Sequence, residues 1–200
     1  MNNNGIRWDH NLIYSLIEPD SSVLDLGCGS GDLLARLSAE KNVTGQAVEA
    51  DPAFVAEAIR NGVAIYQKDL DIGLPEFISK SYDYVVLEKT LQQLRRPLLV
   101  LEEILRIGRT CIVSFPNFNY KGVVKGLLQT GKMPVTTSLP YKWYDTPNIH
   151  LFTLADFMDW AADNDIIIVE GYAAEGVNTR CLKLPDDYTD AEELLFVMKS

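Results

Sequence analysis

A glycine-rich loop is the strongest chemical signal in this chain of 200 residues. Its sequence is DLGCGSG over residues 25–31, between a predicted buried strand and a predicted helix. Gly27, Gly29 and Gly31 lack a Cβ atom, so the backbone can turn tightly and a ligand can approach it closely. We therefore predict that these glycines bind a small organic cofactor, with Cys28 as a small residue that fills space between them.

Two classes of cofactor bind loops of this kind. A dinucleotide fingerprint requires its last glycine or alanine at position 32, which is Asp32 here. A carboxylate at a helix N-terminus would also repel a pyrophosphate. Asp25, two residues before the first glycine, is placed to hold the ammonium group of an amino-acid ligand. The pattern favours S-adenosylmethionine (SAM), or its product S-adenosylhomocysteine, over a dinucleotide.

Acidic residues follow the second and third predicted strands. Glu49 lies 18 residues after Gly31, close to the spacing of roughly 20 expected for a carboxylate that binds ribose hydroxyls. The alternative is an exposed acid in a turn. We predict that Asp69 and Leu70 contact the adenine, with Asp69 accepting from its amino group. Asp71 could accept from the amino group in place of Asp69. The alternative to a cofactor role is that the carboxylate of Asp69 simply belongs to a turn.

Residues after the fourth predicted strand are the usual place for methyl-transfer chemistry. Glu88 is predicted to line the pocket, or else to pair with Lys89 or Arg95 in solvent. His150 is either a base or a structural hydrogen-bonding group, and His10 is assigned to the surface or to packing. No side chain stands out as a general base, so the catalytic residues remain unassigned, and no metal site is predicted.

The elements that position these residues alternate between strands and helices, which predicts βαβ units and a parallel sheet. Strands are predicted over 22–26, 43–48, 64–67, 82–87, 110–115 and 166–169, and helices over 32–37, 52–60, 97–107 and 153–164. Residues 194–198 are predicted as a last antiparallel strand, in preference to a helix from 189. We expect a single Rossmann-like α/β domain over 1–200, with a mostly parallel seven-stranded sheet flanked by helices.

Residues 116–150 break this pattern. The segment holds prolines at 116, 134, 140 and 147, several aromatic residues, and lysines at 121, 125, 132 and 142 against the single acid Asp145. Long irregular loops in compact domains usually carry function. We predict an irregular insertion after the fifth strand, which serves either as a lid or as a partner-binding segment.

The composition narrows the class of protein. Asp and Glu number 28 against 18 Lys and Arg, giving a net charge of −10, which disfavours a nucleic-acid partner. No apolar stretch approaches the roughly 18 residues of a membrane span, and the first residues do not resemble a signal peptide. Cysteines at 28, 111 and 181 are widely spaced, as expected of reduced thiols. We expect a cytoplasmic protein.

Several longer motifs resemble those of one family, the methionine biosynthesis protein MetW. They are QKDLDIGL at 67–74, TLQ at 90–92, SFPNF at 114–118, GKMPVT at 131–136 and LPYKWYDTPNIH at 139–150. The resemblance runs from Asp9 nearly to the C-terminus. It implies the fold of class I SAM-dependent methyltransferases. The chain departs from the family pattern at Glu88-Lys89, where small polar residues are common in relatives, and at Ser30, which is often an acidic residue in them.

The resemblance also implies a function in methionine synthesis. MetW-like proteins are thought to work with MetX, a homoserine O-acyltransferase, as a partner that its activity needs. We expect contact with such an enzyme through Phe115 to His150. The alternative is an active SAM-dependent methyltransferase that acts on a small-molecule acceptor.

Overall fold

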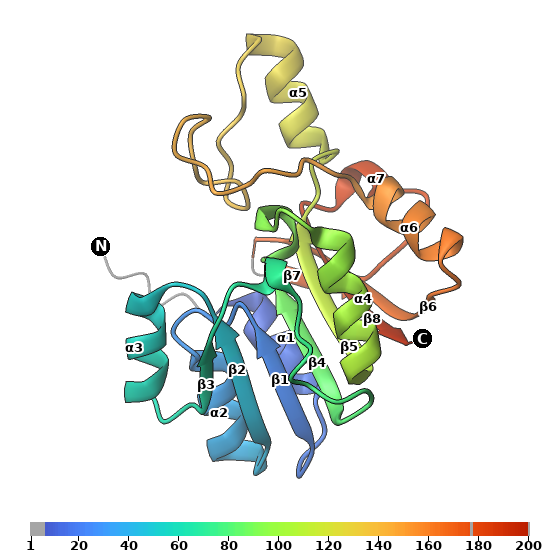
Figure 1. The fold of residues 1–200 in the computed structure, drawn as a ribbon. Coiled ribbons are helices and arrows are strands. Elements are labelled where there is room, and N and C mark those ends of the chain that lie inside the picture. Colours follow the sequence, from blue (N-terminus) through green and yellow to red (C-terminus); the bar gives the residue numbers. More distant parts are fainter. Residues whose placement is uncertain (1–6, 177, 200) are drawn as a thin grey trace.

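A computed structural model describes residues 7–176 and 178–199. One eight-stranded sheet runs through it in the order β3-β2-β1-β4-β5-β8-β6-β7 (Figure 1). The strands are β1 (Ser22–Leu26), β2 (Thr44–Glu49), β3 (Ile65–Gln67), β4 (Tyr82–Glu88), β5 (Gly108–Pro116), β6 (Ile167–Glu175), β7 (Asn178–Cys181) and β8 (Glu193–Lys199). The α-helices are α1 (Trp8–Leu16), α2 (Asp32–Lys41), α3 (Pro52–Arg60), α4 (Pro97–Ile107), α5 (Lys121–Thr130), α6 (Leu154–Asp163) and α7 (Asp187–Asp190). Short 3-10 turns, η1 (Leu70–Ile72) and η2 (Leu91–Gln93), follow β3 and β4.

The expected Rossmann-like α/β fold is confirmed, with one strand more than the predicted seven. Strands β1 to β5 are parallel, while β8 pairs antiparallel with β5 and β6. The additional strand, β7, forms a hairpin with β6. Its residues are NTRC and all four are exposed, so the sequence offers no apolar alternation by which a strand is recognised.

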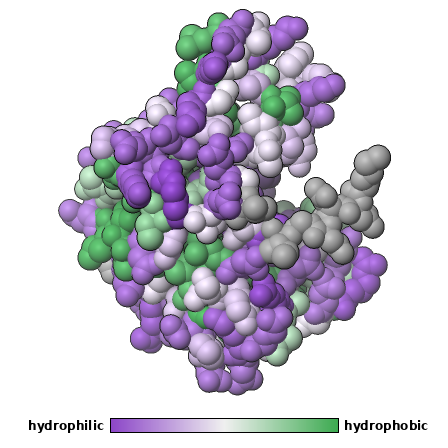
Figure 2. Space-filling view, turned by 180° about the vertical axis from the view of Figure 1, so that it is seen from behind, coloured by the Kyte–Doolittle hydropathy of each residue, from purple (hydrophilic) through white to green (hydrophobic). Residues whose placement is uncertain are grey.

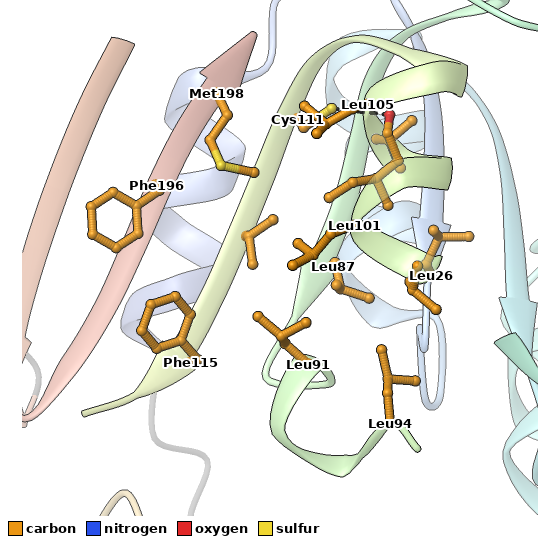
Figure 3. Close-up of a cluster of buried hydrophobic side chains, with 14 of the residues drawn as sticks. Leu26, Leu87, Leu91, Leu94, Leu101, Leu105, Cys111, Phe115, Phe196 and Met198 are labelled. Carbon is orange, nitrogen blue, oxygen red and sulfur yellow. Dashed lines mark hydrogen bonds between the residues drawn. The ribbon is translucent and has the colours of Figure 1, made fainter. Parts of the chain in front are cut away.

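Helices cover both faces of the sheet. On one face, Ile13 of α1 and Leu34 of α2 pack against alternate strand residues such as Val23 and Val86. On the other face, α4 and α6 pack against the strand residues whose side chains point to that side, such as Leu26 and Leu87. Figure 3 shows this second layer, in which Leu101 of α4 lies over Leu87 of β4. The strands at the centre are buried on both faces, which explains their continuous apolar sequences.

Aromatic packing ties the antiparallel edge to the central strands. Phe115 of β5 lies beside Phe196 of β8, with ring centroids 5.8 Å apart (Figure 3). Phe157 of α6 stacks on Phe196 at 4.9 Å. The prediction of a C-terminal strand is therefore confirmed, and the short helix α7 that precedes it accounts for the helical pattern near 189.

Local capping signals placed two helices correctly. Asp51 accepts a hydrogen bond from the Ala53 amide at 2.8 Å, and Pro52 occupies the first turn of α3. Thr153 and Asp156 form a reciprocal capping box at the start of α6. These interactions explain why the predicted and observed helix starts agree closely.

The prediction that residues 116–150 are irregular throughout was wrong. Helix α5 occupies Lys121–Thr130 and ends at Gly131, whose φ of +64° is the left-handed conformation common after helices. Val123 and Leu127, four residues apart, had offered a helical signal. In Figure 1, α5 and the loop after it project away from the sheet as a lobe, which we call the 116–150 lobe.

Candidate functional site

The candidate site lies where the chain reverses direction across the sheet. From β1 the chain moves outward to β2 and β3, and then returns to β4 on the other side of β1. Leu26 pairs with Val48 and with Leu87, so the three strands end at the same level. Ligands of open α/β sheets bind at such switch points, beyond the carboxyl ends of the strands.

A cavity of about 200 Å³ opens at this edge of the sheet. We call it the switch-point cavity. Predicted site residues that line it are Asp25, Gly27, Cys28, Gly29 and Glu88. Arg7, His10, Ser30, Leu33 and Phe54 complete its walls. The structure thus brings the glycine loop, the acid of β1 and the acid of β4 together.

Backbone geometry at the loop requires glycine. Gly27 has φ +73°, and a Cβ there would lie 2.5 Å from Thr90 Oγ1. Gly29 has φ +55°, and a Cβ there would meet no atom within 4 Å. A side chain at Gly29 would therefore enter open space at the rim of the cavity, whereas one at Gly27 would collide with the turn after β4.

Glu49 fixes the loop from outside the cavity walls. Its Oε2 accepts a hydrogen bond from the Gly29 amide at 2.9 Å, and its Oε1 accepts from Ala50 and Asp51 at 2.8 and 2.9 Å. The carboxylate therefore lies between the end of β2 and the glycine loop. Its predicted role as a ribose ligand stays a prediction.

Asp25 is the most strongly perturbed acid at the site. Its side chain is buried, and burial raises its pKa from 3.8 to about 7. The nearby Arg7 guanidinium opposes this shift, while Glu49 adds to it. A buried carboxylate with an elevated pKa at a cavity wall is typical of a ligand-binding or catalytic group.

We expect Asp25→Asn to stabilise the protein at pH 8. The folded-state pKa of Asp25 lies above its unfolded value, so the free energy of unfolding falls as pH rises from about 4 to 7 and stays low above that. Asparagine removes this penalty, worth up to about 4 kcal/mol at about 1.4 kcal/mol per pKa unit. Urea denaturation at pH 5 and pH 8 measures the gain, which should be less than half as large at pH 5.

Asp83→Asn is the matched control for this prediction. Asp83 accepts hydrogen bonds from the Ser22 amide and hydroxyl, at 2.9 and 2.7 Å, and these bonds lower its pKa. Its replacement should destabilise the protein at pH 8. Destabilisation by both substitutions would contradict the strained, buried charge assigned to Asp25.

Glu88 lies inside the cavity rather than in solvent. Its carboxylate forms an ion pair with Arg7, and its Oε2 lies 3.2 Å from His10 Nε2. Burial, together with Arg7, lowers the pKa of His10 to about 4, although Asp9 and Asp32 act in the opposite direction. His10 is therefore neutral at pH 7 and lies against Glu88 without adding a charge. The alternative pairing of Glu88 with Lys89 or Arg95 was wrong.

Lys89 belongs to a second group of charges behind the cavity. Its Nζ lies 3.1 Å from Asp9 and 2.9 Å from Glu193. Burial would raise the pKa of Asp9, but Lys89 and Arg7 together hold it below the usual value. Ligand atoms of Asp9, His10 and Glu88 lie within 4.8 Å of one another. Because Arg7 and Lys89 already neutralise these carboxylates, the geometry favours an ion-pair network over a metal ion.

Other predicted cofactor residues lie outside the cavity walls. Gly31 precedes α2, and Leu70 is part of the apolar core. Asp69 accepts from the Asp71 amide at 2.9 Å and caps η1. Asp71, its rival, accepts from the amides of Arg95 and Arg96 at 3.0 and 2.7 Å. These contacts leave the adenine contacts of Asp69 and Leu70 as a prediction.

Cys28 and His150 are both poor candidates for chemistry in the cavity. Burial, with the charges of Asp25 and Glu49, raises the pKa of Cys28, so its thiol stays protonated. His150 lines a separate apolar cavity of about 180 Å³ beside α4 and α6. Its amide donates to the Gln92 carbonyl at 3.0 Å. Its backbone therefore holds the end of the lobe against η2.

Sequence reasoning missed Arg7 and His10, because α1 was not predicted. Leu12, Ile13 and Leu16 have helical spacing, and this was the available signal. The helical spacing could not show that Arg7 and His10 line a cavity, because that depends on where α1 packs against β4. His10, assigned to the surface or to packing, contacts Glu88 instead.

The 116–150 lobe carries most of its large apolar side chains in contact with solvent. The exposed ones are Leu127, Leu128, Met133, Val135, Tyr141, Trp143, Tyr144 and Ile149. Figure 2 shows hydrophobic residues among polar ones on the lobe, which an indentation separates from the body below. A third cavity, of about 290 Å³, lies within the lobe and is lined by residues such as Phe118, Met133 and Trp143. It shares no lining residue with the switch-point cavity.

Residues 7–188 match the family model described as methionine biosynthesis protein MetW. A curated relative from Rhodopirellula baltica, the bifunctional methionine biosynthesis protein MetXA/MetW, is 36% identical over 173 residues. The match covers 81% of this chain but 27% of the relative, so the chain spans about a quarter of that protein's length.

Solved structures of SAM-dependent methyltransferases share the fold. One from Thermotoga maritima has a TM-score of 0.67 and 14% identity, covering 95% of this chain and 90% of that one. A TehB-like enzyme from Corynebacterium glutamicum has a TM-score of 0.65 and 15% identity, covering 99% and 90%. Among residues 7–176 and 178–199, no helix is both long and apolar enough to cross a bilayer.

Proposed function

Because the chain belongs to the family of methionine biosynthesis protein MetW, we propose that it is a SAM-binding partner that activates a homoserine O-acyltransferase of the MetX type. The observation that carries this proposal is the relative whose name joins MetXA and MetW in one bifunctional chain. Two activities joined in one polypeptide are held at high effective concentration. Where the acyltransferase is a separate chain, a docking surface would have to replace that covalent link.

The switch-point cavity supports the cofactor part of the proposal. Asp25 offers a buried carboxylate to the ligand's ammonium group, and Arg7 offers a cation to its carboxylate. The backbone at Gly27 and Gly29 is open to close approach by the ligand. Glu49, hydrogen-bonded to the loop, is within reach of a ribose attached to that amino-acid end. SAM, when bound, supplies a cationic sulfonium group.

The 116–150 lobe supports the partner part. Trp143 is 77% exposed and Leu128 is 81% exposed, and exposed apolar side chains gathered on one projection are typical of interaction surfaces. Aromatic residues of this kind often anchor interfaces. The lysines of the lobe outnumber its acids, which suits a partner surface that presents carboxylates around an apolar centre.

The alternative is a methyltransferase that acts on a small molecule. The apolar cavity within the lobe favours it, since a cavity of about 290 Å³ could hold an acceptor. However, the two cavities share no wall, and His10 is engaged with Glu88 rather than free to act as a base. For methyl transfer, the lobe would have to move so that an acceptor bound in its cavity reaches the cofactor in the switch-point cavity.

Co-elution separates the two functions. The protein and the acyltransferase from the same source are mixed at equal concentrations and separated by size-exclusion chromatography with light scattering. A joint peak with the mass of a complex supports the partner role. Separate peaks at all concentrations, together with transfer of a labelled methyl group to a metabolite extract, would support the enzyme instead.

A further inference from the structure

The switch-point cavity carries charges of both signs at one end. Asp25 and Glu88 contribute carboxylates to its walls, and Arg7 contributes a guanidinium. Lys89, although next to Glu88 in sequence, pairs with Asp9 and Glu193 instead. Asp25 is mostly ionised only above pH 7, and with both carboxylates ionised the walls hold one more negative than positive charge.

Glu88 is held in a partly closed environment. Its side chain is 9% exposed, and it contacts Arg7 and His10, which both come from the start of α1. His10 is neutral at pH 7 because burial lowers its pKa to about 4, so it offers Glu88 a polar contact and no charge. Arg7 is thus the cation that balances Glu88 in the ligand-free protein.

Arg7 is the solvent-accessible member of this ion pair. Its side chain is 50% exposed, and it shares its guanidinium between Glu88 and Asp9, whose Oδ1 and Oδ2 it meets at 3.1 and 2.9 Å. Because Glu88 and Asp9 are both shielded from solvent, Arg7 can leave Glu88 only if another cation takes its place. A ligand that brings a carboxylate for Arg7 and cationic groups for Glu88 meets this condition.

The charges of the two candidate ligands differ by one unit. SAM carries an ammonium, a carboxylate and a sulfonium, so it has one net positive charge. S-adenosylhomocysteine has the same amino-acid end, but its sulfur is neutral. Charges inside a protein cavity are screened less than charges in bulk water, so one charge facing a carboxylate has a large effect on affinity. The net negative walls complement SAM and leave the neutral product without that attraction.

We propose that Arg7 and Glu88 exchange partners when the ligand enters, and that this exchange makes the cavity select SAM over S-adenosylhomocysteine. Arg7 leaves Glu88 for the ligand's carboxylate, and Glu88 then faces the ligand's cationic groups. The inference rests on the proposed function, since it needs the cavity to hold this cofactor. If the inference holds, the occupancy of the cavity follows the concentration of SAM rather than the summed concentration of SAM and S-adenosylhomocysteine.

Calorimetric titration of the full chain with each compound tests the exchange. We expect the unaltered protein to bind SAM at least about tenfold more tightly than S-adenosylhomocysteine, and Glu88→Gln to reduce this ratio to about twofold or less. Arg7→Ala should weaken both ligands by a similar factor without reducing the preference for SAM. Glu40→Gln, which removes an exposed acid paired with Arg36, is the matched control and should keep the ratio.

Three results would overturn the inference. Equal affinities in the unaltered protein would exclude charge selection while leaving the cofactor role intact. An unchanged ratio in a folded Glu88→Gln variant, checked by circular dichroism, would assign the selection to another group. Absence of binding by either compound would overturn both this inference and the proposed cofactor.

Discussion

Replacing Gly29 with leucine should abolish SAM binding and leave the sheet intact. A Cβ atom at this position meets no protein atom within 4 Å, so the side chain would extend into open space at the rim of the switch-point cavity. The ligand and the leucine would then compete for the same volume. We expect the affinity for SAM to fall by at least about 100-fold, equivalent to about 2.7 kcal/mol. Calorimetric titration of the purified variant measures this loss.

Gly62→Leu is the matched control for Gly29→Leu. Gly62 also has a positive φ, +80°, and open space around its Cβ position, but it lies after α3 and outside the cavity. Both substitutions carry a similar left-handed backbone penalty of about 1–2 kcal/mol. If Gly29→Leu and Gly62→Leu bind SAM equally well, the cavity is not the cofactor site.

Truncating Trp143 should weaken the complex with the acyltransferase. Its ring is 77% exposed and lies edge-on to Tyr144, with centroids 5.6 Å apart. Its removal costs the isolated protein little, since little buried area is lost. Aromatic hot spots contribute about 2 kcal/mol or more to binding, so Trp143→Ala should raise the dissociation constant by about 30-fold. Surface plasmon resonance with immobilised acyltransferase provides the measurement.

Ile78→Ala controls for the general loss of exposed apolar surface. Ile78 is 76% exposed, nearly the same as Trp143, but it lies before β4 and far from the lobe in sequence. Its substitution should leave the dissociation constant unchanged. If Trp143→Ala binds like the unaltered protein while Ile78→Ala binds less tightly, the interface lies elsewhere on the molecule.

The central sheet could be predicted because its signals are local. β1 is a short apolar run followed directly by glycines, and α3 begins with a capping acid and a proline. Such features depend on a few neighbouring residues and need no knowledge of distant contacts. For the same reason, the sequence indicated that Asp25, Gly29 and Glu88 would meet, since the ends of parallel strands converge at one edge of the sheet.

Features that depend on distant contacts could not be predicted in the same way. Arg7 reaches Glu88 only because α1 packs against the sheet, and Lys89 joins Asp9 to Glu193 across three elements. β7 is polar throughout and is defined by its pairing with β6. The cytoplasmic location and the roles of Asp69 and Leu70 remain predictions.

The homoserine acylation rate of the acyltransferase, with and without this protein, tests the central claim most directly. The two proteins are mixed in equal amounts, and acylation is followed with and without added SAM. The proposed function predicts a rise in rate of severalfold or more that saturates near equal amounts, and a smaller rise with Trp143→Ala. An unchanged rate at every ratio of the two proteins would contradict an activating role and return the small-molecule methyltransferase to first place.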